Sequence, residues 1–284
     1  MKTILIPTDF SENAWNTISF ALQFLKNERC TFYFLHTYTP AFYRMDYVLG
    51  GPEFSAIADK GVDASLSGLE MTLQKVKANF NNPKHIYETV SAFNVLTDEI
   101  TELSHSKSVD LIIMGTQGAS GAKEIFLGTN TVHVIRKATV PILAIPAGFV
   151  YKRIEKILFA ADYKSKYHRK ELYTAIEIAK IFDALITVLH IKEEYELSKV
   201  QKENKDFLAL CLAQIKFEFK EERGSYMPEA VIEYVEEHDF DILVMMNRNH
   251  SFFERILTKQ NIDQIGFHIQ VPFLVVPDNS NSSK

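Results

Sequence analysis

The chain is poor in cysteine, with only Cys30 and Cys211 among its 284 residues. Two cysteines are too few for the disulfide framework of a small secreted domain, and these two do not have the spacing of metal ligands. The sequence also lacks a run of about 18 apolar residues that could span a bilayer. Its first residues contain only a short apolar stretch, which indicates a β-strand rather than a secretory signal. We therefore expect reduced thiols, no metal site, no membrane partner and a cytoplasmic location.

A strong excess of charge is missing as well. The chain has 31 Lys and Arg against 36 Asp and Glu, a formal net charge of -5, which gives no general attraction to nucleic acid. Hydrophobic residues make up 46% and charged residues 24%, which is typical of soluble globular domains. The composition predicts that the chain folds throughout and has no nucleic-acid partner.

Four stretches of sequence occur twice, in the same order. They are residues 3–10 and 156–163 (TILIPTDF and KILFAADY), 34–36 and 188–190 (FLH and VLH), 109–114 and 240–245 (VDLIIM and FDILVM), and 140–146 and 271–277 (VPILAIP and VPFLVVP). Short apolar runs of this kind are typical of parallel strands that are buried on both faces. The repeat predicts two similar domains, residues 1–147 and 152–279, with a short join between them.

The segments between the predicted strands have helical periodicity. Apolar residues follow Ser11, a plausible N-cap, at helical spacing. A second apolar stripe consists of Val62, Leu66, Leu69, Leu73, Val76 and Phe80. Strands that alternate with amphipathic helices predict an α/β fold, here two doubly wound parallel-sheet domains.

A glycine-rich loop follows the predicted strand at residues 111–114. Gly115 and Gly118 come first, and nine residues later Gly128 precedes Thr129 at the expected start of a helix. Glycines let the backbone approach a ligand closely, and the free N–H groups of a helix start suit phosphate. The spacing matches neither a Walker loop nor a dinucleotide fingerprint.

Residues 114–129 (MGTQGASGAKEIFLGT) resemble the Gly-x2-Gly-x9-Gly-Ser/Thr motif of ATP-binding universal stress proteins. Residues 6–11 (IPTDFS) are similar to the first strand of that family, and residues 140–143 (VPIL) to its last strand. The resemblance covers both halves, as in a tandem form of the family. It implies five-stranded, Rossmann-like sheets of order 3-2-1-4-5, with the ligand at the switch point between strands 1 and 4.

The resemblance also implies roles for individual residues in binding ATP, with Mg²⁺ as a companion of the triphosphate. Pro7, Thr8 and Asp9 correspond to the adenine and ribose end, the backbone of Thr37, Tyr38 and Thr39 to a cover over the base, Met114, Gly115 and Gly118 to the ribose and α-phosphate, and Gly128, Thr129, Asn130 and Thr131 to the outer phosphates, where the hydroxyls of Thr129 and Thr131 are possible donors.

Each of these residues also has a purely structural interpretation. Asp9 can cap the helix that starts near Ser11. Gly115 and Gly118 can be turn glycines, and Gly128 can be a break between helices. His36 and its counterpart His190 are better explained as packing or hydrogen-bonded residues than as catalysts.

The second half has lost the glycine loop. Residues 245–260 (MMNRNHSFFERILTKQ) contain none of the three glycines, and aligning Glu254 with Glu124 places Thr258 and Lys259 at the positions of Gly128 and Thr129. Side chains at these positions obstruct close backbone contact with phosphate. The sequence predicts a structural or pairing domain, although Asp162 is retained and leaves a different small ligand open.

These observations favour a nucleotide-dependent regulatory or stress-response protein with an adenine nucleotide and an unidentified protein as partners. The alternatives are a nucleotide hydrolase or transferase, for which no nucleophile elbow, Walker lysine or base is evident, and a scaffold that binds nothing. No catalytic residue is predicted. The last strands, residues 140–146 and 271–277, are expected to pair the halves as an internal pseudo-dimer, and a homodimer is a further option. The aromatic segment 38–52 is either a lid or partner surface, or a packing loop.

Overall fold

The computed structural model describes residues 1–38, 60–116, 128–192, 196–224, 227–247 and 270–277. Thr39, Gly118, most of the segment 38–52 and most of the degenerate loop 245–260 lie outside these ranges. In the first half, the elements are β1 (Lys2–Pro7), α1 (Glu12–Phe24), β2 (Cys30–Tyr38), α3 (Lys60–Asn79), β3 (His85–Phe93), α4 (Leu96–Ser106), β4 (Leu111–Gly115), α5 (Thr129–Lys137) and β5 (Ile142–Ile145). In the second half, they are β6 (Lys156–Ala160), α6 (Arg169–Phe182), β7 (Leu185–Lys192), α7 (Lys199–Leu212), β8 (Phe217–Arg223), α8 (Met227–Glu237), β9 (Ile242–Asn247) and β10 (Phe273–Pro277).

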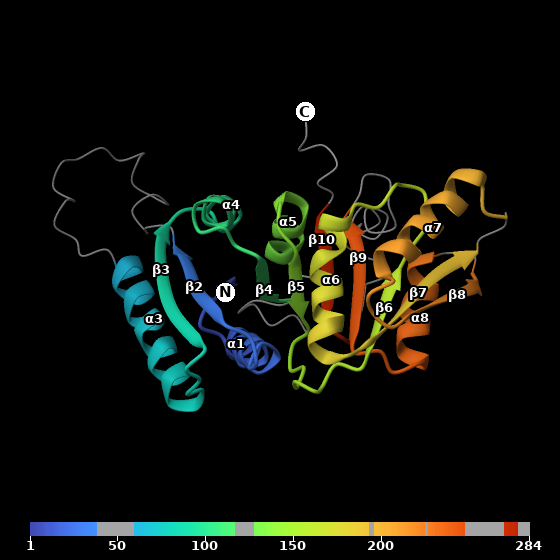
Figure 1. Ribbon diagram of the computed structural model, residues 1–284. Helices are drawn as coiled ribbons and strands as arrows, with labels where there is room; N and C mark the ends of the chain where they lie inside the picture. The colour runs from blue at the N-terminus through green and yellow to red at the C-terminus, as the bar shows by residue number, and fades with distance from the viewer. Residues whose placement is uncertain (39–59, 117–127, 193–195, 225–226, 248–269, 278–284) are drawn as a thin grey trace, which may run out of the picture.

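The strands form one sheet in the order β3-β2-β1-β4-β5-β10-β9-β6-β7-β8, which crosses the whole molecule in Figure 1. Within each half the strands are parallel and have the predicted order 3-2-1-4-5. The halves join where β5 and β10 pair antiparallel, with Leu143 opposite Leu274. The expected internal pairing of the last strands is therefore confirmed.

Helices cover both faces of the sheet, which explains why the strands have continuous apolar runs rather than alternating ones. One core contains buried side chains of α1, α3, α6 and α7, and the other contains those of α4, α5 and α8. Residues of both halves occur in each core, because the sheet continues across the β5–β10 pair. The two halves are thus packed together as well as paired.

The inner face of α3 differs in part from the predicted apolar stripe. Leu69 and Val76 are buried, but Leu66 is 54% exposed, and Ser65 and Gly68 lie on the buried side instead. The reason is that this part of the helix faces Phe10 and His36, whose rings leave room only for small residues. The small residues of α3 thus help to shape the end of β1.

Cys30 and Cys211 are buried and unpaired, in agreement with the expectation of free thiols. Within the described ranges, no helix is both long and apolar enough to cross a membrane.

Candidate functional site

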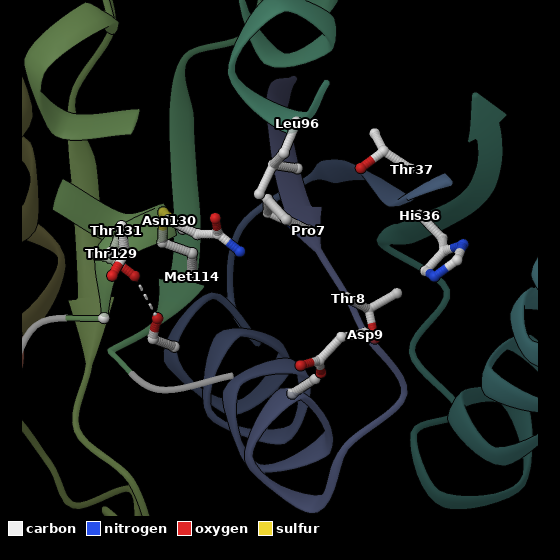
Figure 2. Close-up of a pocket in the computed structure, with 13 residues that line it drawn as sticks. Pro7, Thr8, Asp9, His36, Thr37, Leu96, Met114, Thr129, Asn130 and Thr131 are labelled. Atoms are coloured by element: carbon white, nitrogen blue, oxygen red, sulfur yellow. Dashed lines mark hydrogen bonds between the residues drawn. The ribbon is translucent and has the colours of Figure 1, made fainter. Parts of the chain in front are cut away.

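A cavity of about 440 Å³ lies at the carboxyl ends of β1 and β4, the switch point of the first half. These strands are neighbours, with Ile4 opposite Leu111, although more than 100 residues separate them in the sequence. The volume of the cavity is within the range of small-molecule sites. The lining residues, shown in Figure 2, are Pro7, Thr8, Asp9, Ala14, His36, Thr37, Leu96, Met114, Gly115, Gly128, Thr129, Asn130 and Thr131.

Most residues singled out in the sequence meet around this cavity. Tyr38, whose backbone is expected to cover the base, is not among the lining residues, and the centroid of its ring lies 6.1 Å from that of Phe93. The sequence did not indicate Ala14, His36 and Leu96 as lining residues. Ala14 and Leu96 occupy the first turns of helices that follow strand ends, so their place in the βα connections was the signal that could have found them.

The first turn of α5 provides the polar end of the cavity. Gly128 is the N-cap, and the first backbone bond within the helix runs from the N–H of Val132 to the carbonyl of Gly128, at 3.0 Å. The N–H groups of Thr129, Asn130 and Thr131 therefore have no acceptor inside the helix. Their dipoles give this end of the cavity a partial positive charge.

Two hydrogen bonds fix α5 against the end of β4. The hydroxyl of Thr131 donates to the carbonyl of Gly115 at 2.9 Å, and the N–H of Gly128 donates to the carbonyl of Thr116 at 2.5 Å. The Thr131 side chain is buried, and in this structure its hydroxyl proton is engaged by the carbonyl of Gly115. Thr131 holds the helix in place, whereas Thr129 is exposed to the cavity.

Asp9 lies across the cavity from α5 (Figure 2). Its Oδ1 accepts hydrogen bonds from the backbone N–H of Ser11 at 3.1 Å and from its hydroxyl at 2.6 Å. Ser11 in turn caps α1 by accepting from the N–H of Ala14. Asp9 thus supports a helix cap and still exposes a carboxylate, so its structural and ligand-facing interpretations are compatible. Lysine and arginine are absent from the described lining, which leaves a negative and a positive end.

Aromatic stacking shapes the wall next to Asp9. Phe10 has a φ of 64°, and its ring stacks on that of His36 with 4.5 Å between the centroids. A Cβ atom on Gly68 would lie 2.4 Å from Cε2 of Phe10, so α3 approaches this ring as closely as only glycine allows. His36 Nδ1 also lies 2.9 Å from the hydroxyl of Ser65. His36 is the packing and hydrogen-bonded residue that was expected, and it also lines the cavity.

The environment of His36 predicts a pH dependence of stability. Burial lowers the pKa of His36 below its usual 6.5, with a smaller opposing effect from Asp9. The unfolded chain therefore binds more protons than the folded chain as the pH falls through 6.5, and stability must decrease. Between about pH 7.5 and pH 5.5, we expect wild type to lose more unfolding free energy than His36→Gln. Urea titrations at the two pH values measure this difference, and equal losses would contradict the assignment. His85, whose pKa is also lowered by burial, contributes equally to both proteins.

The second half keeps the aromatic and histidine pair but covers the end of its first strand. Tyr163, with a φ of 55°, packs on His190 with 4.9 Å between the ring centroids, like Phe10 on His36. Gln201 donates to the carbonyl of Asp162 at 2.9 Å, and Asn204 donates to the carbonyl of Tyr163 at 2.8 Å. In the second half, side chains of α7 therefore bind the turn after the first strand. The corresponding turn in the first half borders the cavity.

The start of the degenerate loop also supports the first half. Asn247 stands at the position that corresponds to Thr116 in the repeat. Its side-chain amide donates to the carbonyl of Ile135 in α5 at 2.9 Å. The second half thus contacts the helix whose N-terminus lines the cavity.

Comparisons with known proteins point to one family. The model of the universal stress protein family matches residues 1–146 and again residues 153–277. Two universal stress proteins of Methanocaldococcus jannaschii are each 28% identical to the chain over about half of its length, and 94% and 81% of these relatives are covered. The crystal structure of a universal stress protein from Archaeoglobus fulgidus DSM 4304 has a TM-score of 0.68 at 21% identity and covers 97% of this chain and 96% of its own. Because the sequence identity to this crystal structure is only 21%, the similarity shows the fold alone.

Proposed function

The chain belongs to the universal stress protein family, and from that premise we propose that its first domain binds ATP and that the chain acts as a nucleotide-dependent regulatory or stress-response protein in the cytoplasm. We assign the first domain to residues 1–147 and the second to residues 152–279. The proposed activity is binding that a protein partner reads, and it requires no turnover.

The polarity of the cavity is the observation that carries this proposal. The N–H groups of Thr129, Asn130 and Thr131, which have no acceptor within the helix, form one end, and the exposed carboxylate of Asp9 forms the other. Phosphates are attracted to a helix N-terminus and repelled by a carboxylate. A nucleotide therefore fits in one orientation, with its phosphates at α5 and its ribose and base towards Asp9.

The remaining lining residues suit this orientation. Met114 and Gly115, at the end of β4, lie between the two ends, next to the expected place of the ribose and α-phosphate. Pro7, Thr8 and Thr37 belong to the base end. Gly118, from the glycine motif, and the backbone of Tyr38 and Thr39, from the family resemblance, remain proposed ligand-binding groups. A Mg²⁺ ion would be held by the outer phosphates near Thr129, since the described residues contain no group of three acidic, histidine or cysteine side chains that could hold a metal by themselves.

One experiment on the purified chain separates the candidate functions. The protein is prepared without added nucleotide, any bound small molecule is released with acid and identified, and the stripped protein is then incubated with ATP. Recovered or rebound ATP without release of ADP or phosphate supports the proposal. Sustained turnover that Asp9→Ala abolishes would favour a hydrolase or transferase. If ATP neither copurifies with the chain nor binds to the stripped protein, the result would favour a scaffold that binds no nucleotide.

Replacing Asp9 by alanine is expected to weaken ATP binding about tenfold, a loss of about 1.4 kcal/mol. The substitution removes the ribose-side acceptor and the support that Asp9 gives to Ser11. The matched control is Asp162→Ala, because Asp162 holds the same place in the second domain and accepts a local backbone bond from Lys164. Isothermal titration should show the loss in the first variant alone. Similar affinities for both variants would remove Asp9 from the site.

A further inference from the structure

A second cavity, of about 710 Å³, lies where the two halves meet. It opens at the amino ends of β1 and β4, between the end of α1 and one side of α6. The cavity proposed to bind the nucleotide lies at the opposite, carboxyl ends of these strands. The apolar and aromatic lining residues of the second cavity are Met1, Ile4, Phe24, Leu25, Leu111, Tyr173, Ile178 and Ile181, of which Met1 and Tyr173 are exposed. The proposed nucleotide function makes no use of this space, which we call the inter-domain cavity.

The repeat gives important residues around this cavity a counterpart. In α1 the buried positions include Ala14, Thr17, Ile18, Phe20 and Ala21, and in α6 they include Leu172, Ala175, Ile176, Ile178 and Ala179, at the same spacing. Ile178 in the lining therefore corresponds to Phe20.

Asp110, which also lines the cavity, corresponds to Asp241. Each of these aspartates precedes a central strand, and each exchanges hydrogen bonds with the backbone of the first-strand residue beside it, Thr3 or Lys156. The pair of aspartates thus marks equivalent places in the two halves.

The counterpart of the inter-domain cavity is filled by the join between the halves. The rings of Phe149 and Tyr151 pack on Phe20, with centroid distances of 5.9 and 5.7 Å. The ammonium group of Lys152 forms a 2.7 Å ion pair with Asp241. Val150, between the two rings, points outward and is 79% exposed. An extended segment with two inward aromatic rings and a following cation therefore fits this kind of place.

The inter-domain cavity lacks such a filling within the described part of the chain. Asp110 is exposed, and no ion pair with a described cation involves it, in contrast to Asp241. Neighbouring charges are engaged elsewhere: Lys2 lies 3.9 Å from Glu28, and Lys84 donates to the carbonyl of Asn27. Arg29 also lines the cavity. A bound cation would therefore be held by direct contact with Asp110 and not by the net charge of the lining.

We propose that the inter-domain cavity binds an extended segment of a partner protein that carries two aromatic residues, one residue apart, followed by lysine or arginine. The aromatic side chains lie over Ile178 and pack against the exposed Met1 and Tyr173 of the lining, in the place that Phe149 and Tyr151 take against Phe20. The cation pairs with Asp110. This proposal does not depend on nucleotide binding, because the two cavities are at opposite edges of the sheet.

The chain itself supplies the probe, an acetylated and amidated peptide of residues 148–153 (GFVYKR) with a fluorescent label. Fluorescence polarisation with the full chain should give a dissociation constant of about 10–100 μM. The same peptide with both aromatic residues replaced by alanine should bind at least about tenfold more weakly, because aromatic anchors dominate such contacts. Equal binding of the two peptides, or no binding at about 1 mM, would overturn the proposal.

Asp110→Asn keeps an oxygen for the N–H of Thr3 and removes the charge, so the fold should be retained. We expect this variant to bind the peptide about threefold more weakly, the effect of one exposed ion pair. The control Asp98→Asn changes an exposed carboxylate in α4 that pairs with Lys137, and it should bind like wild type. Equal effects of the two variants would contradict the assignment of Asp110. Self-association of the chain that Asp110→Asn abolishes would show a second copy in the cavity and overturn the choice of partner.

Discussion

Replacing Gly128 by aspartate is expected to lower the affinity for ATP about 100-fold, a loss of about 2.7 kcal/mol. Gly128 is the N-cap of α5, with φ -57° and ψ 150°, a conformation that any residue adopts. Aspartate is a favourable N-cap and its charge suits the helix dipole, so the variant should fold at least as well as wild type. The same charge would repel the phosphates proposed to lie there.

The control for this variant is Gly128→Ser, which adds a comparable cap without charge. We expect Gly128→Ser to weaken ATP binding clearly less than Gly128→Asp, because its side chain crowds the phosphate end without repelling the phosphates. Thermal melting without nucleotide should show no loss of stability for either variant. Titration calorimetry of the two variants then distinguishes the effect of charge at the phosphate end from the effect of side-chain size at the N-cap. Equal ATP affinity of Gly128→Asp and wild type would place the phosphates elsewhere.

Replacing Gly68 by alanine is expected to destabilise the chain by about 1–2 kcal/mol, the reverse of what helix propensity predicts. Alanine is the better helix former by about 1 kcal/mol. The added Cβ atom would, however, lie 2.4 Å from the Phe10 ring, and His36 stacks on that ring and limits its movement. Urea unfolding followed by the fluorescence of Trp15, the single tryptophan, measures the effect.

Two further variants identify the cause. Ser67→Ala changes an exposed position of the same helix and should be neutral or slightly stabilising. In a Phe10→Ala background the cost of Gly68→Ala should disappear, because the clashing ring is absent. If Gly68→Ala stabilises the chain by the full propensity difference, the Phe10 ring does not limit the space at Gly68.

The repeat made most of the fold predictable from the sequence. Each pair of matched stretches became a pair of equivalent strands, and the resemblance supplied their order, because periodicity alone does not say which strands are neighbours. The pairing of β5 with β10 was expected from the last strands, and the structure adds that the two halves form a continuous sheet with shared cores.

The details of the cavity depended on contacts that no pattern in the sequence reveals. The buried hydroxyl of Thr131 donates to the carbonyl of Gly115, which becomes apparent only when α5 is placed against β4. Tyr38 follows Thr37 along β2, yet alternate side chains point to opposite faces of a strand, and Tyr38 packs near Phe93. Ser65 and Gly68 interrupt an apolar stripe because they face Phe10 and His36.

The difference between the two halves is consistent with a division of roles. In the second half, Gln201 and Asn204 hold the turn after β6, and Asn247 reaches the helix of the first half that bears the proposed phosphate site. This is the arrangement expected of a domain that supports its partner rather than of a second binding site.

The number of ATP molecules bound per chain distinguishes one nucleotide site from two. The full chain is titrated with ATP by calorimetry, at protein concentrations well above the dissociation constant. A ratio of about one per chain is expected, with the affinity lowered about 100-fold in Gly128→Asp and kept in Asp162→Ala. A ratio near two, or a ratio near one with an affinity that Gly128→Asp leaves unchanged, would contradict the claim that the first domain alone holds the nucleotide.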